Sequence, residues 1–309
     1  MRKVALYSYD GPAGLRISRV PTPEPGPGEV LVRTEAAGVT LPVLKVLRGH
    51  GSAPLPYEPG GDLVGRVRAI GPGVTTLRVG DRVGGLAFSG AYADVVVAPA
   101  ELLAPVPEGV SAADAVALVR SGLVALAALS VGGLRLGESV VVTAAAGGVG
   151  HLAVQLARAM GAGRVVAAVG SLEKAEFVRR LGADEVVVYG DLGDVPAVDL
   201  VMEGVGGPTA QSAQDALVPF GRLVVLSGAG GTLDAGALLR GGHVALGLSM
   251  AQLVRHRPDA VERWRHELWG HLAAGRLRPS CTAVPLDRAA DAVALLESRR
   301  NLGKVLLTP

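Results

Sequence analysis

Two different patterns of apolar and polar residues divide the chain. Up to about residue 110, short apolar runs of strand length are separated by Gly- and Pro-rich turns such as PTPEPGPGE (21–29) and GPGVTTLRVGDRV (71–83). Many short strands at this spacing are typical of a compact, barrel-like β domain. The predicted strands are VALYSYD (4–10), LRISRV (15–20), EVLVRTEAAGV (29–39), DLVGRVRAIG (62–71), DRVGGLAF (81–88) and YADVVVAP (92–99).

From about residue 115 to 250, strand-length apolar runs alternate with helical stretches. This rhythm predicts parallel βαβ units in a doubly wound sheet. The strands are SVVVTA (139–144), RVVAAVG (164–170), EVVVYG (185–190), VDLVMEGVG (198–206), GRLVVLSG (221–228) and HVALGLS (243–249), and the helices among them are GHLAVQLARAMG (150–161), SLEKAEFVRRLG (171–182) and TAQSAQDALVPF (209–220). Two further helices (259–274 and 286–299) and a last strand, GKVLLTP (303–309), complete the prediction.

Composition narrows the class of protein. With 49% hydrophobic and 19% charged residues, the 309-residue chain is typical of a globular protein. The net charge of +2 and the lack of a Lys/Arg run argue against nucleic acid and membrane surfaces as partners. No secretory signal is visible at the N-terminus, and the uncharged stretch 121–134 is shorter than the ~20 residues of a membrane span. We therefore expect a cytoplasmic protein with a small-molecule partner.

Metal and thiol chemistry have little support in the sequence. Cys281 is the only cysteine, so it forms neither an intrachain disulfide nor a cysteine-based zinc site, and we expect an unreactive, buried thiol. The histidines lack a set of partners, and His266 and His271 are five residues apart rather than four. We expect no metal; the histidines lie at positions 50, 151, 243, 256, 266 and 271.

The segment AAAGGVG (144–150) stands directly between a predicted strand and a predicted helix. Glycines there permit a tight turn and the close approach of a pyrophosphate, and the helix N-terminus offers free N–H groups. A second strand about 20 residues further on strengthens the prediction of a dinucleotide site over that of a merely tight turn. The candidate cofactor residues are Ala146, Gly147, Gly148, Val149 and Gly150.

The tip of the second strand indicates which dinucleotide binds. An NAD site usually has Asp or Glu at this tip to hold the ribose 2′-hydroxyl. Here the tip is Gly170 and Ser171, followed by Lys174, and a hydroxyl with an ammonium group suits a 2′-phosphate. Glu173 is the one opposing charge. The sequence therefore predicts NADP(H) as the cofactor.

These segments together resemble the zinc-free quinone oxidoreductase and enoyl reductase branch of the medium-chain dehydrogenase/reductase superfamily. The resemblance implies an α/β fold in which a GroES-like β-barrel domain (1–115 and 251–309) carries an inserted Rossmann domain (116–250), and a homodimer. Gly60-Gly61-Asp62 replaces the Gly-His-Glu motif of zinc-dependent relatives, and their four-cysteine lobe is absent. The resemblance rests on AAGV (36–39), LPYEPGGD (55–62), AIGPGVTTLRVGDRV (69–83), GAYADVVV (90–97), GESVVVTAAAGGVGHLAVQLARAMGA (137–162), EKAEFVRRLGAD (173–184), GRLVVLSG (221–228) and GKVLL (303–307).

The same resemblance assigns candidate site residues. It implies that Ser171, Lys174 and Tyr189 hold the adenosine 2′-phosphate and that Ser227 and Asn301 line the cofactor. The active-site positions depart from the family pattern. Thr40 replaces an Asn beside the nicotinamide, Val43 replaces an Asp, and Val124 and Leu126 replace a Thr and a Tyr. Thr40 is the candidate catalytic residue, although it could merely satisfy the local backbone, and an apolar substrate pocket would include Leu44, Val124 and Leu126.

The departures favour one reaction class. Reduction of an activated C=C bond or a quinone needs a well-placed hydride acceptor but no strong side-chain acid, whereas zinc-free alcohol oxidation needs a side-chain base, and none is evident. We therefore predict an NADPH-dependent reductase of an α,β-unsaturated carbonyl or a quinone. Two alternatives remain open: a non-redox step such as a cyclisation or isomerisation, and a cofactor-binding protein with a regulatory role.

Overall fold

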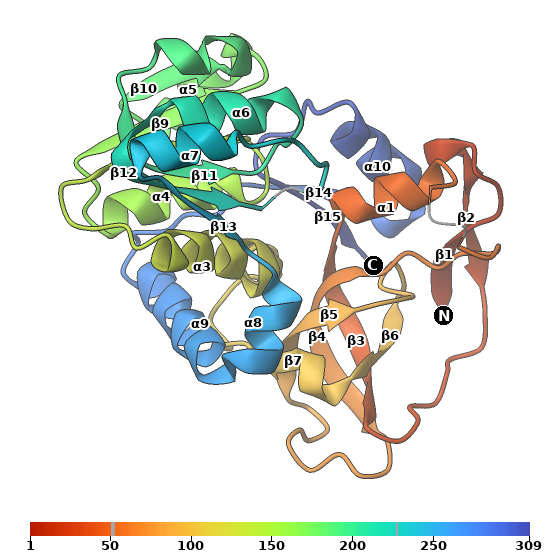
Figure 1. The fold of residues 1–309 in the computed structure, drawn as a ribbon. Helices are drawn as coiled ribbons and strands as arrows, with labels where there is room; N and C mark the ends of the chain where they lie inside the picture. The colour runs from red at the N-terminus through yellow and green to blue at the C-terminus, as the bar shows by residue number, and fades with distance from the viewer. Residues whose placement is uncertain (51–52, 227) are drawn as a thin grey trace. The chain divides into compact units, whose positions relative to one another are not determined.

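The fold is seen in a computed structural model that describes residues 1–50, 53–226 and 228–309. The chain forms two compact units, one of residues 1–120 and 279–309 and the other of residues 121–278 (Figure 1). These bounds differ from those we predicted, chiefly because residues 251–278 belong to the inserted unit. The helices α8 (Met250–His256) and α9 (Pro258–Ala273) pack on each other, and α9 packs on α3 (Leu123–Val131).

The first unit is built on a mixed sheet in the order β14-β15-β3-β4-β5-β7. β6 pairs with the first half of β3, residues 29–33, and β1 and β2 form a separate antiparallel pair. Its strands are β1 (Arg2–Leu6), β2 (Leu15–Arg19), β3 (Glu29–Gly38), β4 (Gly61–Ile70), β5 (Arg82–Ala87), β6 (Val95–Pro99), β7 (Leu103–Pro105), β14 (Cys281–Pro285) and β15 (Lys304–Thr308). Its helices are α1 (Leu41–Leu47), α2 (Ala112–Ala117) and α10 (Ala289–Glu297).

Both chain ends contribute to this unit, as the resemblance implied. β15 pairs antiparallel with β3, and β14 pairs parallel with β15. The core combines residues from both chain ends, for example Val32, Leu63 and Leu307. β14 and α1 were not among the predicted elements, because each is short and lacks a clear apolar period.

The second unit holds a six-stranded parallel sheet in the order β10-β9-β8-β11-β12-β13. This is the doubly wound order, in which the first strand lies in the middle and the chain proceeds outward on both sides. The prediction of a doubly wound sheet is thereby confirmed. The strands are β8 (Ser139–Val142), β9 (Arg164–Val169), β10 (Glu185–Val188), β11 (Val198–Glu203), β12 (Leu217–Val225) and β13 (Val244–Gly247), and the remaining helices are α4 (Gly150–Ala159), α5 (Ala175–Arg180), α6 (Pro208–Asp215) and α7 (Ala235–Gly241).

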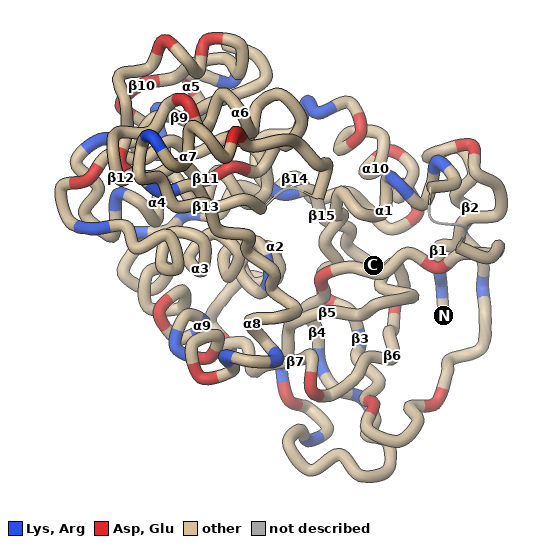
Figure 2. Tube along the Cα trace, in the orientation of Figure 1, with Lys and Arg blue, Asp and Glu red and all other residues tan. Residues whose placement is uncertain are grey.

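The packing of the second unit follows from its sequence pattern. Strands β8, β9 and β11 are buried along almost their whole length, as expected for a parallel sheet covered by helices. Helix α4 packs on β8 and β9, and α6 packs on β11 and β12. The core between sheet and helices includes Val141, Val166 and Leu223. Lys, Arg, Asp and Glu are interspersed along the trace in both units (Figure 2).

One continuous helical stretch, Ala112–Val131, is long and apolar enough to cross a membrane by length and composition alone. Two thirds of its apolar window, 67%, is buried within the protein, as in the core helix of a globular protein. Within the stretch, residues Leu118–Gly122 form a π-helical turn between α2 and α3. The cytoplasmic location stays a prediction.

Candidate cofactor site and active site

The glycine turn lies where a dinucleotide site is expected. In a doubly wound sheet, ligands bind at the carboxyl ends of the strands, where the chain switches direction. Here the switch lies between β8 and β11, which are neighbours in the sheet. The turn follows β8, and α4 begins at Gly150. The structure thus brings Ala146, Gly147, Gly148, Val149 and Gly150 together at the N-terminus of a ten-residue helix.

Gly150 shows why the turn needs glycine. A Cβ atom at this position would lie 2.2 Å from the Ala144 carbonyl oxygen and 2.7 Å from the Ala145 Cα. Both are backbone atoms, which cannot move away by a change of rotamer. Ala144 itself has a φ of 49°, a left-handed conformation that is uncommon outside glycine. The Gly147 amide donates to the Ala144 carbonyl at 2.8 Å. The turn therefore packs directly against the start of α4, and a side chain at position 150 would clash with its backbone.

The candidate 2′-phosphate residues lie together at the tip of β9. Val188 pairs with Val169, which sets Tyr189 beside Gly170, and a Cβ at Gly170 would be 3.6 Å from the Tyr189 ring. Ser171 caps the short turn Leu172–Lys174, and its hydroxyl accepts from the Glu173 amide at 3.3 Å.

That short turn also places the charges at the tip. It contacts β10, so Lys174 is brought to the same end of the sheet as Tyr189. Lys174 is half-buried, whereas Glu173 is exposed. No carboxylate precedes Ser171, so the tip suits a phosphate better than a bare ribose hydroxyl.

Two polar residues at the switch point were missed by sequence reasoning. Thr143 follows β8, and its Oγ1 accepts from the Gly204 amide at 2.8 Å. Glu203 ends β11 and is fully buried; its Oε1 accepts from the Val205 and Gly206 amides at 2.7 Å, while its Oε2 is buried with no hydrogen-bond partner among the described residues. These bonds shape the loop after β11 around the glycine turn. The only sequence signal was the glycine-rich segment EGVGG (203–207).

In the first unit, Thr40 directly follows β3 and is the N-cap residue of α1. Its side chain makes no capping hydrogen bond, so this contact does not support the alternative that Thr40 only satisfies the local backbone. Val43 is 3% exposed and belongs to the core, and Leu44 packs against that core. The position for which the family resemblance implies Asp is therefore an apolar core position here.

The other proposed pocket and cofactor residues differ in how much surface they offer. Val124 is half-buried, but Leu126 is fully buried in α3 and has no surface to offer to a substrate. Asn301 is buried, and its side-chain amide donates to the Gly303 carbonyl at 2.9 Å, which stabilises the turn before β15. Ser227 lies outside the described residues.

Cys281 lies in an environment that disfavours the reactive thiolate form. The half-buried thiol lies 3.4 Å from the Ala113 carbonyl, and burial raises its pKa to about 11.

Within residues 1–50, 53–226 and 228–309, no group of three or more His, Cys, Asp or Glu side chains is placed to hold a metal ion.

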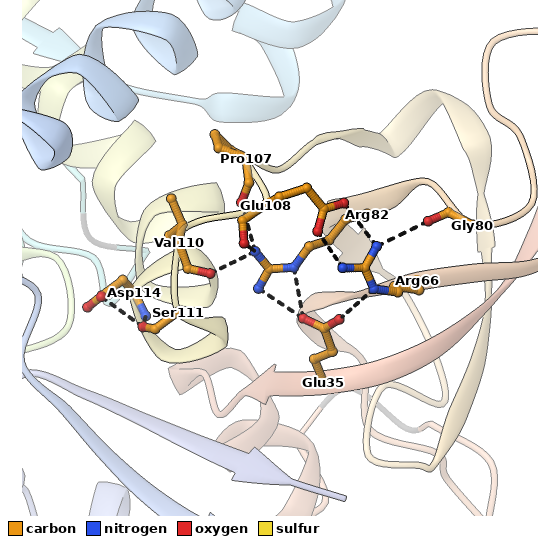
Figure 3. Close-up of polar contacts among 9 residues, drawn as sticks. All are labelled: Glu35, Arg66, Gly80, Arg82, Pro107, Glu108, Val110, Ser111 and Asp114. Atoms are coloured by element: carbon orange, nitrogen blue, oxygen red, sulfur yellow. Dashed lines mark hydrogen bonds and ion pairs between the residues drawn. The ribbon is translucent and has the colours of Figure 1, made fainter.

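An arginine–carboxylate network fixes the segment that leads into α2 (Figure 3). The buried Arg82 binds Glu35 at 2.9 Å and donates to the Pro107 and Val110 carbonyls at 2.8 and 2.7 Å. Arg66 reaches the same Glu35 at 3.5 Å and also pairs with Glu108. Because Arg82 satisfies carbonyls of the connecting segment, β3 and β5 hold the start of the long helical stretch in place.

A doubly wound parallel sheet with a glycine turn at its switch point, inserted into a β-rich unit made from both chain ends, defines a two-unit, dinucleotide-dependent oxidoreductase. Comparisons with known proteins agree. Residues 26–108 match the alcohol dehydrogenase GroES-like domain family model, and residues 148–265 match the zinc-binding dehydrogenase family model. The chain belongs to the medium-chain dehydrogenase/reductase superfamily, in its quinone-oxidoreductase-like branch.

Similar proteins cover the whole chain. The quinone oxidoreductase of Pseudomonas aeruginosa is 32% identical over 100% of this chain and 99% of its own length. The rat synaptic vesicle membrane protein VAT-1 homolog is 30% identical over 100% of this chain and 84% of its own. Among solved structures, Escherichia coli quinone oxidoreductase complexed with NADPH has a TM-score of 0.90 at 27% identity, and a mycobacterial protein complexed with NADPH has 0.90 at 31% identity, each over 100% of both chains.

Proposed function

We propose that the protein is an NADPH-dependent reductase that transfers hydride to an α,β-unsaturated carbonyl or a quinone without zinc. The observation that carries the proposal is the tip of β9, where Gly170, Ser171, Lys174 and Tyr189 lie together without a carboxylate before Ser171. The similarity to two structures that hold NADPH supports the choice of cofactor.

The residues present fit the dinucleotide. The glycine turn lies at the N-terminus of α4, whose positive dipole end favours an anion such as the pyrophosphate. Ser171, Lys174 and Tyr189 would hold the 2′-phosphate. When bound, the cofactor supplies a hydride, and the chain orients it and excludes water. Thr40 would hold a substrate oxygen, since its hydroxyl makes no capping bond.

The substrate class follows from the chemistry that the chain lacks. Oxidation of an alcohol without zinc needs a side-chain base near the substrate. The family resemblance implies polar residues at positions 43, 124 and 126, but here Val43 and Leu126 are core residues, and the half-buried Val124 is apolar as well. An acceptor whose carbon takes hydride directly, and whose proton comes from water, suits such a pocket better.

The cofactor choice is tested with a matched pair of variants, Gly170→Ala and Gly170→Asp. A Cβ fits at position 170, so Gly170→Ala should bind NADPH like the wild type. The carboxylate of Gly170→Asp, within about 5 Å of a phosphate with about two negative charges, costs about 2–3 kcal/mol at an effective dielectric constant of about 50. NADPH affinity, measured by fluorescence titration, should fall about 100-fold while NADH affinity is kept or improved.

Substrate-dependent oxidation of NADPH, followed by its absorbance with a panel of enones and quinones, tests the reaction. Tight NADPH binding with no oxidation across the panel would favour the non-redox or the regulatory alternative. Equal affinity of the wild type for NADH and NADPH would overturn the assignment of the β9 tip.

We also propose that the protein is a homodimer formed at the β13 edge. β13 is the last strand of its sheet, pairs with β12 alone among the described strands, and is mostly exposed. Large apolar side chains lie exposed nearby: Leu239 is 84% and Phe220 79% exposed. Unpaired strand edges with apolar neighbours favour pairing with a second copy.

Light scattering after size exclusion should show a dimer, and Val244→Lys should shift it to a monomer. A monomeric wild type would refute the proposed dimer.

A further inference from the structure

A buried ionic cluster in the first unit has no role in the function proposed above. Asp62 on β4 is fully buried, and its Oδ2 forms an ion pair with the ammonium group of Lys304, which is itself 4% exposed. Asp62 pairs in register with Gly38 at the end of β3. A Cβ at Gly38 would lie 2.8 Å from both the Asp62 Oδ2 and the Lys304 Cε, so a larger residue there would press on both side chains of the ion pair.

A second cation reaches the same carboxylate. The Arg120 Nη1 lies 3.4 Å from the Asp62 Oδ1. One carboxylate, Asp62, thus lies between two cations, Lys304 and Arg120, so the three groups together carry one net positive charge. The Arg120 side chain is 36% exposed, and in the part of the chain that the structure describes, this long contact is its one polar interaction. Most of its five N–H donors are therefore not used by the residues that the structure describes.

The backbone that carries Arg120 is unusual. Arg120 lies in the π-helical turn Leu118–Gly122, in the middle of the helical stretch Ala112–Val131. Single π turns inside helices are rare and occur often at functional sites. The turn breaks the regular helical register just before Val124, the one proposed pocket residue of α3 with exposed surface.

The cluster also lies next to the candidate catalytic residue. Thr40 follows Gly38 by two residues at the end of β3. Tyr92 lies at the same place, because a Cβ at Gly61 would be 2.6 Å from the Gly38 carbonyl oxygen and 3.8 Å from the Tyr92 Cε1. The Asp62 charge adds to the effect of burial in raising the pKa of Tyr92. Thr40 and the cationic cluster therefore belong to one region of the first unit.

We propose that Arg120, oriented by Asp62, donates hydrogen bonds to the carbonyl oxygen of the acceptor and stabilises the oxyanion that forms there during reduction. The inference rests on the proposed function and adds to it a positively charged group for the acceptor oxygen. A guanidinium suits this role because it stays charged and presents several donors in one plane. The Thr40 hydroxyl alone would offer the developing charge one neutral hydrogen bond and no positive charge.

The electron balance of the step is simple. Hydride brings two electrons to the β-carbon of the enone, the π pair of the C=C bond moves to the carbonyl, and an enolate oxygen results. Arg120 hydrogen-bonds to this oxygen without giving up a proton. Water then protonates the α-carbon, so that the acceptor gains one hydride and one proton in total.

Kinetics of Arg120→Met test the proposal, with Arg66→Met as the matched control. The Arg66 side chain is 34% exposed and also pairs with carboxylates, but it belongs to the network of Figure 3. Arg120→Met leaves Asp62 paired with Lys304, so it should fold. We expect kcat/KM for the acceptor to fall about 100-fold, mostly in kcat, with the Kd of NADPH unchanged. Arg120→Lys, which keeps the charge, should lose less, and Arg66→Met should stay within about two-fold.

A binding measurement distinguishes failure of the inference from failure of the proposed function. 4-Nitrophenol imitates the enolate, since its phenolate carries the charge on an oxygen conjugated to an unsaturated system and absorbs visible light. Protein added below the pKa of the free phenol should increase phenolate absorbance for wild type and Arg66→Met but not for Arg120→Met.

The outcomes are distinct. A wild type that oxidises no NADPH but shows the Arg120-dependent phenolate signal would refute the proposed reaction and keep the anion site. An equal phenolate signal in Arg120→Met, or a kcat/KM within two-fold of the wild type, would overturn the role of Arg120.

Discussion

The substitution Gly150→Ala is the sharpest test of the cofactor turn. The added Cβ would lie 2.2 Å from the Ala144 carbonyl oxygen, whereas Cβ atoms in proteins essentially never approach closer than 3.0 Å. Either the turn or the start of α4 must therefore move by about 1 Å, and no side chain can absorb the shift. Overpacking of this kind costs about 1–3 kcal/mol.

The expected effects are two. The thermal midpoint of unfolding should fall by about 2–4 °C for each kcal/mol lost, since the second unit holds 158 residues. NADPH binding should weaken more than stability does, because the shift displaces the amides that face the phosphates. Losing even one charge-assisted hydrogen bond costs about 1.5–3 kcal/mol, which corresponds to at least a tenfold increase in Kd.

Circular dichroism melts without cofactor and calorimetric titration with NADPH measure the two effects separately. Gly270→Ala is the matched control, because Gly270 also lies in a helix of the second unit, and a Cβ there would meet nothing within 4 Å. That variant should be unchanged or stabilised by up to about 1 kcal/mol. If Gly150→Ala binds NADPH within three-fold of the wild type at an unchanged midpoint, the turn is not the phosphate cradle.

Three further predictions concern charge and burial. Asp62→Ala should destabilise the protein by about 3–5 kcal/mol in urea unfolding, because it removes the carboxylate from the buried Lys304 ammonium; a loss below 1 kcal/mol would contradict this. Cys281 should react slowly with iodoacetamide at pH 7.5 and faster at each higher pH, since burial raises its pKa to about 11; labelling as fast as a free thiol would show that it is exposed. The hydrogen bond from Arg222 holds the pKa of Glu138 below its usual value of 4.5, so the pair stabilises the fold above that pH and loses its effect as acid protonates Glu138. The difference in unfolding free energy between wild type and Arg222→Met should therefore shrink below about pH 4.5, and a difference constant down to pH 3 would speak against the pair.

Local patterns in the sequence determined most of the fold. Apolar runs of strand length alternating with helical stretches predicted the strands β8 to β13, and the glycine turn predicted where the dinucleotide site lies, because both depend on neighbours a few residues apart. The sequence at the tip of β9 predicted the choice of NADP(H) for the same reason. Short elements with no period of their own, such as α1 and β14, were not.

Only the tertiary structure decided which distant residues meet. Asp62 and Lys304 are 242 positions apart, and their contact depends on β3 lying between β4 and β15, with Gly38 leaving room. Nothing in the sequence around Arg120 indicates the π turn or the contact with Asp62. Leu126 looked like a pocket residue, yet packing encloses it completely. Contacts of this kind depend on how strands pair and helices pack, and no local period in the sequence records them.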